Sequence, residues 1–270
     1  MLRMIGAGGM GVVFQAEDPQ LGRLVALKVM RPGLASDAVV RKRFLREARA
    51  MAAIKHDHVL TVYQVGEERG IPFFAAGLLE GESLEDRPRR EGHQPAAEVL
   101  RVGREMAEGL AAAHERGLVH RDVKPANVWL ERPRGRVKVL DFGLARNSRA
   151  EANLTQKGTI LGTPAYMAPE QAQGRAVDQR TDLFSLGCVL YRACTGRLAF
   201  PGDDKIAILL SVSTQDPPPP AQVSRDVPSG LSDLVMRLLA KQPEARPQTA
   251  AAVAAALQEL ERFAKGWRTE

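Results

Sequence analysis

The spacing of apolar residues changes along the chain and divides it into two parts. In the first eighty residues most apolar positions fall in short runs bounded by turn residues, a pattern that predicts β-strands. The runs are 12–14, 24–30, 59–65 and 71–79. From Ala38 to Ile54, apolar residues recur at spacings of three and four, which predicts one helix. The first part therefore predicts a small sheet that carries a single helix.

Beyond residue 80 the spacing becomes helical. A stripe from Val99 to Ala113 predicts a long helix that stops at Gly117, where glycine can cap a helix end. The segment Asp182–Cys194 is apolar almost all round, so we expect a buried helix there. Pro217–Pro220 predicts an extended linker without a helix. Two further helices are expected at 231–239 and about 249–263. The second part is thus a larger, mainly helical lobe.

Composition places the chain among soluble globular proteins. It has 270 residues, of which 44% are hydrophobic and 26% charged, values that exclude disordered and fibrous classes. Its two cysteines, Cys188 and Cys194, form neither a disulfide framework nor a zinc spacing and fit a reducing cytosol. No apolar run reaches the ~18 residues that a membrane span needs, and the N-terminus lacks a secretory pattern. We expect a cytoplasmic protein without a membrane segment.

The net charge of +6, from 38 basic and 32 acidic residues, raises the question of nucleic-acid binding. The basic residues are scattered instead of forming a stripe, and only three tyrosines and two tryptophans could stack on bases. We therefore expect no nucleic-acid partner and attribute the positive charge to phosphate chemistry.

The segment from Gly6 to Gly11 has the pattern G-x-G-x-x-G. Glycines let a backbone approach a phosphate closely and present its N–H groups. A dinucleotide site is the first alternative, but it requires a helix directly after the third glycine and an acidic residue about twenty positions later. Residues 12–14 are strand-like, so the dinucleotide interpretation is rejected.

Lys28 interrupts the apolar run 24–30. A lysine within an apolar strand is costly unless its ammonium meets an anion, although an isolated lysine more often extends to the surface. Glu47, on the predicted helix, could pair with Lys28 and hold it against a phosphate. By itself Glu47 is one of many helix-surface acids, and its significance depends on the motifs that follow.

The chemistry is concentrated in two short segments. Asp122, Lys124 and Asn127 fall within six residues on a predicted loop, and Asp141 follows a strand-like stretch, 137–140. Asn127 and Asp141 offer oxygen ligands that suit Mg²⁺, which binds through few protein groups plus substrate phosphates. Asp122 is then free to orient a nucleophilic hydroxyl and accept its proton.

In order and spacing these motifs resemble the serine/threonine protein kinases. The segments 162–170 and 182–187, with Arg246, match later landmarks of that family. The glycine loop and the segment 124–127 resemble the eukaryotic-like kinases of bacteria. The resemblance covers nearly the whole chain.

The resemblance implies an α+β, bilobal protein-kinase fold for a single kinase domain, 1–270. A small antiparallel sheet with one helix would form the N-lobe, 1–79, and a larger helical lobe would follow at 80–270. The first strand looks truncated, because only residues 1–5 precede the glycine loop. The implied function is ATP-dependent phosphorylation of Ser and Thr hydroxyls on protein substrates in bacterial signalling, with autophosphorylation.

Carried over residue by residue, the resemblance implies a catalytic group of Asp122, Lys124, Lys28 and Glu47. Asp122 would act as base, Lys124 would stabilise the γ-phosphoryl group, and Lys28, fixed by Glu47, would hold the α- and β-phosphates. Asn127 and Asp141 would bind Mg²⁺. The expected ATP contacts are Ile5, Gly6, Ala7, Gly8, Gly9, Met10, Gly11, Val13, Ala26, Lys28, Gly77 and Leu79.

Further roles follow from the same resemblance. Ala76 would be the gatekeeper residue at the rear of the adenine site, with Trp129 as an unusual floor or an ordinary core aromatic. Glu170 would pair with Arg246, and Asp182 would anchor the catalytic loop. Thr163 would favour Ser/Thr acceptors over Tyr.

Regulation is expected through the segment between Gly143 and Gly162. Arg121 is placed to meet a phosphate there, with Thr155 as the first candidate and Thr159 as the second, and Arg121 as a simple brace is the alternative. Phosphorylation would occur in trans, within a transient homodimer.

Two other functions stay open. A pseudokinase scaffold usually lacks Lys28, Asp122 or Asp141, all of which are present. A small-molecule phosphotransferase would lack the segment 162–170 that docks a polypeptide.

Overall fold

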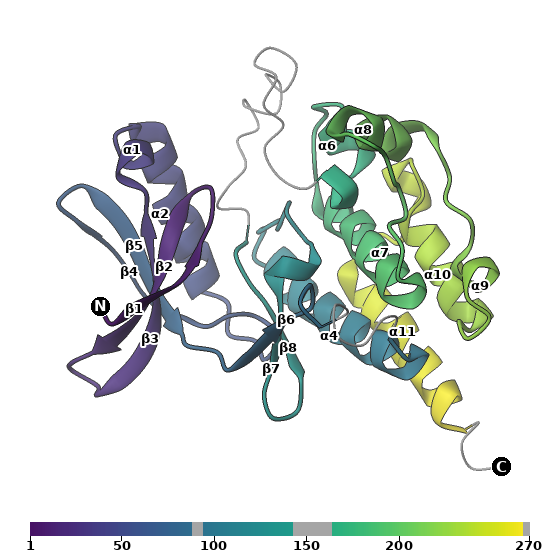
Figure 1. Ribbon diagram of the computed structural model, residues 1–270, viewed down its shortest axis with the longest axis horizontal. Helices are drawn as coiled ribbons and strands as arrows, with labels where there is room; N and C mark the ends of the chain where they lie inside the picture. Colours follow the sequence, from purple (N-terminus) through teal and green to yellow (C-terminus); the bar gives the residue numbers. More distant parts are fainter. Residues whose placement is uncertain (88–93, 143–163, 267–270) are drawn as a thin grey trace.

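The computed structural model describes residues 1–87, 94–142 and 164–266, without the side chains of 264–266. A β-rich lobe and a helical lobe lie side by side, with the N-terminus in the first and the C-terminal helix in the second (Figure 1). This is the α+β, bilobal arrangement that was expected.

The β-rich lobe is one antiparallel sheet of five strands in the order β1-β2-β3-β5-β4. The strands are β1 (Arg3–Ala7), β2 (Gly11–Asp18), β3 (Arg23–Met30), β4 (Val62–Glu68) and β5 (Ile71–Gly77). A short helix, α1 (Pro32–Ala35), and the longer α2 (Ala38–Ala52) follow β3. The Asp37 side chain caps α2 by accepting from the N–H groups of Val39 and Val40. The apolar face of α2 covers the sheet, with the Phe44 and Phe74 rings 5.8 Å apart.

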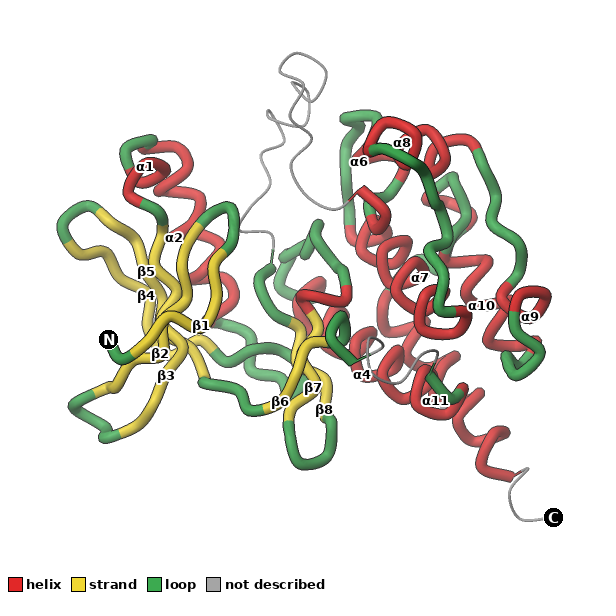
Figure 2. Tube along the Cα trace, in the orientation of Figure 1, coloured by secondary structure: helices red, strands yellow, loops and turns green. Residues whose placement is uncertain are grey.

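The second lobe consists mainly of helices, which are drawn in red in Figure 2. Its helices are α4 (Ala96–His114), α6 (Pro169–Ala172), α7 (Gln179–Thr195), α8 (Lys205–Thr214), α9 (Pro220–Val223), α10 (Ser229–Leu238) and α11 (Ala250–Gly266). Helix α4 packs against both α7 and α11. Helix α7 is buried on nearly every side, which confirms the expectation for 182–194.

A three-stranded sheet lies between the lobes, with β6 (Gly81–Ser83), β7 (Val128–Glu131) and β8 (Arg136–Val139) in that order. It is tied to the chain that leads into β4. Val139 N–H donates to His58 O at 2.9 Å, and Leu60 N–H donates to Val139 O at 3.1 Å. Gly109 on α4 permits this contact, because a Cβ there would lie 2.7 Å from His58 O. The two lobes are therefore joined by backbone hydrogen bonds.

Two local expectations were wrong. Pro220 begins α9 instead of lying in a linker, because proline's fixed φ suits the first position of a helix. The strand expected from residue 59 begins at Val62, since 59–61 bridges to β8. The glycine cap expected at Gly117 is confirmed: the last helical residue of α4 is His114, and Gly117 has a left-handed φ of 69° with its N–H donating to His114 O at 2.9 Å, while Leu118 N–H donates to Ala113 O at 3.0 Å. Within the described ranges, no helix has the length and apolar character needed to cross a membrane.

Candidate active site

A cleft between the lobes consists of two adjoining hollows of about 680 and 410 Å³. Gly6, Val13, Lys28 and Asp141 line both hollows. The predicted contacts Ile5, Ala26, Gly77 and Leu79 line the larger one. Residues 7–11 line the smaller one together with Asp122, Lys124 and Asn127. The structure thus gathers every predicted site residue around one cleft except Glu47.

The glycine loop connects β1 to β2, and glycine is needed at its positions for different structural reasons. A Cβ on Gly11 would lie 2.4 Å from Val29 O, so the fold itself requires glycine there. No atom of the described residues lies within 4 Å of a Cβ on Gly8 or Gly9. Packing within the described chain does not explain these two glycines, whereas a phosphate brought close to the loop would.

Asp182, at the start of the buried helix α7, fixes the loop that carries Asp122. Its carboxylate accepts from the backbone N–H groups of His120 at 2.8 Å and Arg121 at 2.7 Å. His114 Nε2 lies 2.8 Å from Asp182 Oδ2. Arg121 holds a left-handed φ of 62°, a sparsely populated conformation for a non-glycine residue. These bonds confirm the expectation that Asp182 anchors this loop.

The Asp122 carboxylate lies within a compact polar cluster. Lys124 Nζ donates to Asp122 Oδ2 at 2.7 Å, and Asn127 Nδ2 donates to the same oxygen at 3.1 Å and to Asp122 O at 2.8 Å. The Asp122 side chain keeps 18% of its surface exposed, toward the smaller hollow. An oriented and accessible carboxylate of this kind can accept a proton from a hydroxyl group.

His120 positions the segment that carries Asp141. Its Nδ1 accepts from Asp122 N–H at 3.2 Å, so Nε2 bears the proton and donates to Leu140 O at 2.7 Å. The His120 and Phe142 rings lie 4.6 Å apart, and Phe142 is fully buried. Asp141 then turns into the cleft with a left-handed φ of 52°.

Lys28 reaches across the cleft to Asp141. The ammonium lies 2.6 Å from Asp141 Oδ1. Desolvation by the surrounding protein opposes ionisation of Asp141, but favourable interactions, led by the charge and hydrogen bond of Lys28, outweigh it and hold the pKa of Asp141 below its ordinary value. The Asp141 carboxylate is therefore kept ionised and able to bind a cation.

The expected ion pair between Lys28 and Glu47 is not formed among the described residues. Glu47 is 7% exposed, and its Oε2 has no hydrogen-bond partner in the described part of the chain. Burial raises the pKa of Glu47 to about 7, against the lowering effects of Arg43, Arg121 and Arg46. In this structure α2 leaves Glu47 within the field of these arginines, while Lys28 pairs with Asp141, so the Lys28–Glu47 pair stays a prediction.

The rear and floor of the larger hollow include residues that the motifs did not reveal. Ala76 pairs with Ala26 across β5 and β3 and lines the rear with Phe74 and Leu60. Trp129 lines the floor, and its Nε1 is buried without a partner in the described chain. Phe74 and Leu60 lie in predicted strands without any motif, so only the folded arrangement assigns them to the cleft.

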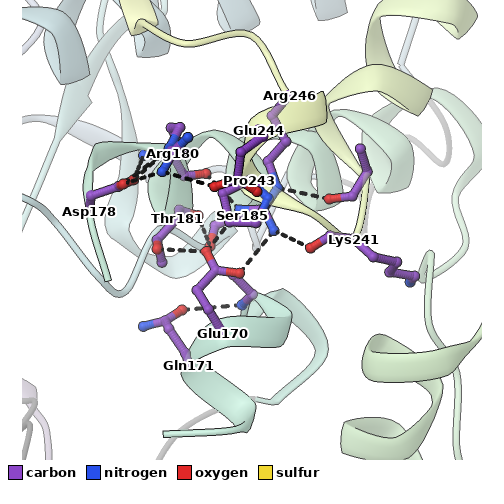
Figure 3. Close-up of polar contacts among 12 residues, drawn as sticks. Glu170, Gln171, Asp178, Arg180, Thr181, Ser185, Lys241, Pro243, Glu244 and Arg246 are labelled. Carbon is purple, nitrogen blue, oxygen red and sulfur yellow. Dashed lines mark hydrogen bonds and ion pairs between the residues drawn. The ribbon is translucent and has the colours of Figure 1, made fainter. Parts of the chain in front are cut away.

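Figure 3 shows the polar contacts between Glu170 on α6 and the far end of the helical lobe. Arg246 Nη1 donates to Glu170 Oε1 at 2.8 Å, and Arg246 Nη2 donates to Oε2 at 2.9 Å. Thr181 adds a third donor to the same carboxylate at 2.7 Å. The predicted pairing of Glu170 with Arg246 is confirmed. Gly143, Ser148, Thr155, Thr159, Gly162 and Thr163 lie outside the described residues.

A family model described as the protein kinase domain matches residues 1–257. The chain belongs to the protein kinase family. The serine/threonine-protein kinase PknB of Mycobacterium leprae is 38% identical over 258 residues, which cover 94% of this chain and 41% of that protein. The serine/threonine-protein kinase pkn2 of Myxococcus xanthus is 41% identical over 266 residues, covering 95% and 32%.

Solved structures agree with this assignment. The crystal structure of the Mycobacterium tuberculosis PknI kinase domain superposes with a TM-score of 0.75 at 30% identity, covering 95% of this chain and 93% of that one. The protein-kinase fold and the resemblance to bacterial serine/threonine kinases are thereby confirmed. This kinase domain spans 41% and 32% of the length of the two curated relatives.

Proposed function

We propose that this kinase domain transfers the γ-phosphoryl group of ATP to Ser and Thr hydroxyls of proteins. The observation that carries the proposal is the cluster of Asp122, Lys124 and Asn127, which faces the glycine loop and the Lys28–Asp141 pair across one hollow. The names of the bacterial relatives support serine and threonine as acceptors.

In the proposed reaction, Asp122 orients the acceptor hydroxyl and takes its proton. The hydroxyl oxygen forms a bond to the γ-phosphorus as the bond to the β–γ bridging oxygen breaks, and ADP leaves. Lys124, 2.7 Å from Asp122, supplies positive charge where the transferring group passes. Because this chemistry consists mostly of positioning and charge stabilisation, each of these side chains should matter greatly.

Lys28 and Glu47 have to rearrange for this role. Lys28 is engaged by Asp141, and a nucleotide's phosphates would draw its ammonium toward them. Glu47 would then pair with Lys28, and the pair would relieve the cost of the buried carboxylate. The described arrangement is accordingly the one before this pairing.

Mg²⁺ fits the oxygen donors of the cleft. Asn127 uses its Nδ2 group to hold Asp122, which leaves its Oδ1 without a hydrogen-bond partner among the residues described. Asp141 offers an ionised carboxylate on the same hollow. Mg²⁺ there would neutralise phosphate charge, with Asn127 and Asp141 as its protein ligands.

The proposal includes regulation by autophosphorylation in the segment between Gly143 and Gly162. Arg121 lies next to Asp122, and a phosphate on Thr155 or Thr159 would pair with it through charge-assisted bonds in a transient homodimer. Mass spectrometry of the purified domain should find phosphate on one of these threonines. An unmodified but fully active domain would contradict this regulation.

Transfer of labelled phosphate from ATP to a generic basic protein tests the main proposal. The expected product is phosphoserine and phosphothreonine, lost with Asp122→Asn. Transfer only to small molecules would favour a small-molecule phosphotransferase. ATP binding without any transfer would favour a pseudokinase scaffold.

A further inference from the structure

A separate hollow, of about 300 Å³, lies between the three-stranded sheet and the N-terminal half of α4. Its lining carries more positive than negative side chains. The charged residues are Arg87, Arg101, Arg132, Arg134, Glu82 and Glu98. Four arginines against two glutamates leave a net charge of +2 in a space that could hold several side chains.

The floor of this hollow is fixed by Glu98. Arg87 Nη1 donates to Glu98 Oε1 at 2.9 Å, and Arg101 donates to both of its oxygens at 2.7 and 2.9 Å. Arg101 continues to Glu105 Oε1 at 2.9 Å and to Gly135 O at 3.0 Å. The last bond attaches the turn between β7 and β8 to α4, so the turn has a defined position.

Arg132 and Arg134 lie on that turn and are exposed. Neither guanidinium has a hydrogen bond or ion pair to any residue that the structure describes. The backbone beneath them is held by the Arg101–Gly135 bond. Two guanidinium groups are thus displayed on a fixed support, which lowers the entropy cost of binding an anion.

The hollow adjoins the active site without being part of it. Gly81 and Arg132 line both this hollow and the nucleotide cleft. The β7–β8 turn lies at the lower edge of the molecule, on the other side from α6 and α8 (Figure 1). A chain bound here would therefore lie beside the nucleotide cleft, with Arg132 on the border that the two hollows share.

We propose that this hollow is a docking site for an acidic segment of a protein substrate. That the partner is a protein substrate rests on the proposed function. Arginine's planar fork matches carboxylates with two parallel hydrogen bonds, and the net charge of the lining is complementary to such a segment. Docking would raise the local concentration of the acceptor hydroxyl and so lower its KM.

The first test measures binding without catalysis. A labelled peptide with a run of glutamate and aspartate and no Ser, Thr or Tyr is titrated with the kinase domain, with fluorescence anisotropy as the readout. Arg132→Ala/Arg134→Ala should weaken binding about tenfold, the loss expected for two charge-assisted contacts at an exposed site. Arg225→Ala/Arg237→Ala is the matched control, because it removes the same charge from α10 and the turn before it.

Several outcomes would overturn the docking site. They are no binding of the acidic peptide, equal loss in both double variants, or no loss in Arg132→Ala/Arg134→Ala. Phosphatidylserine vesicles that bind more tightly than the peptide, and through the same two arginines, would replace a protein segment with a membrane surface.

The second test separates docking from the proposed activity. Two peptide substrates share one acceptor core, and only one carries the acidic run on a flexible linker. Within each protein the two peptides are compared with one another: we expect the run to lower KM about tenfold in the wild type and to have no effect in Arg132→Ala/Arg134→Ala. A wild type that fails on the core peptide contradicts the proposed function, whereas equal KM values for both peptides contradict the docking site alone.

Discussion

The Lys28 ammonium lies 2.6 Å from the Asp141 carboxylate, on the opposite side of the nucleotide cleft. Lys28, expected to hold phosphates, and Asp141, expected to bind Mg²⁺, therefore hold each other in the structure. Glu47, the expected partner of Lys28, is instead buried with one oxygen unpartnered among the described residues. The residues of the cleft are assembled, but Lys28 would have to leave Asp141 and pair with Glu47 for the proposed activity.

Replacing Lys28 tests its proposed role in holding phosphates. Lys28→Met should reduce phosphate transfer by at least about 100-fold, the size of effect seen when one charge-stabilising group is removed. The melting temperature should stay within about 5 °C, because Asp141 is 37% exposed at its side chain and can be solvated when its partner is lost. Near-normal turnover in this variant would contradict the assignment.

The glycine loop offers a test that separates folding from ligand binding. Gly8→Ala should leave the melting temperature unchanged, because its Cβ meets no described atom within 4 Å. The same Cβ should raise KM for ATP, because it would obstruct a phosphate that approaches the loop backbone. Gly11→Ala should lower the free energy of unfolding by about 1–3 kcal/mol, because its Cβ would overlap Val29 O. Loss of stability in Gly8→Ala, measured by urea denaturation, would contradict this division.

Glu47 predicts a pH dependence of stability. Its pKa rises from the ordinary 4.5 to about 7 on folding, so the folded protein binds more protons than the unfolded protein between these values. Stability contributed by the neutral carboxyl is complete below pH 4.5 and is lost as pH rises through about 7. The loss corresponds to about 3 kcal/mol.

Glu47→Gln removes this titration. The variant should match the wild type at pH 4.5, exceed its free energy of unfolding by up to about 3 kcal/mol at pH 8, and still lose kinase activity. Glu115 is an exposed glutamate just beyond α4, and Glu115→Gln should change neither the pH dependence of the free energy of unfolding nor the kinase activity. Parallel pH profiles for Glu47→Gln and the wild type, measured by urea denaturation, would show that Glu47 is not buried in solution.

Ala76 predicts which ATP analogues the cleft accepts. Its methyl group is 1% exposed and borders the rear of the larger hollow, beside Phe74 and Leu60. Analogues with a bulky N6 substituent should bind the wild type, and Ala76→Phe should weaken them by about 10- to 100-fold, the cost of overpacking a closed site. Equal inhibition constants in both proteins would show that Ala76 does not border the adenine site.

The sequence predicted which residues line the cleft better than it predicted how those residues pair with one another. Asp122, Lys124, Asn127 and Asp141 are close in sequence, so their meeting was predictable from spacing, although Asp182 on the distant helix α7 fixes the loop that carries Asp122. The Lys28–Glu47 pair was not, because it depends on where α2 lies relative to the sheet. Arg132 and Arg134 carried no motif at all, and their importance depends on the turn that Arg101 holds in place.

The position of Pro220 illustrates a different limit. A run of four prolines predicts extended chain, yet a proline is favourable at the first position of a helix. Which of these preferences prevails depends on the residues that follow and on packing, here of α9 against α7 and α10. Local preference alone does not decide between them.

Single-turnover phosphate transfer by Asp122→Asn tests the central claim most directly. Asparagine has nearly the same shape and can still accept from Lys124 and Asn127, so the fold and ATP binding should be retained. Because the amide cannot take the hydroxyl proton, the rate of transfer to a Ser/Thr protein should fall by about 100-fold or more. A rate close to that of the wild type, with ATP binding intact in both, would contradict Asp122 as the base and with it the proposed mechanism.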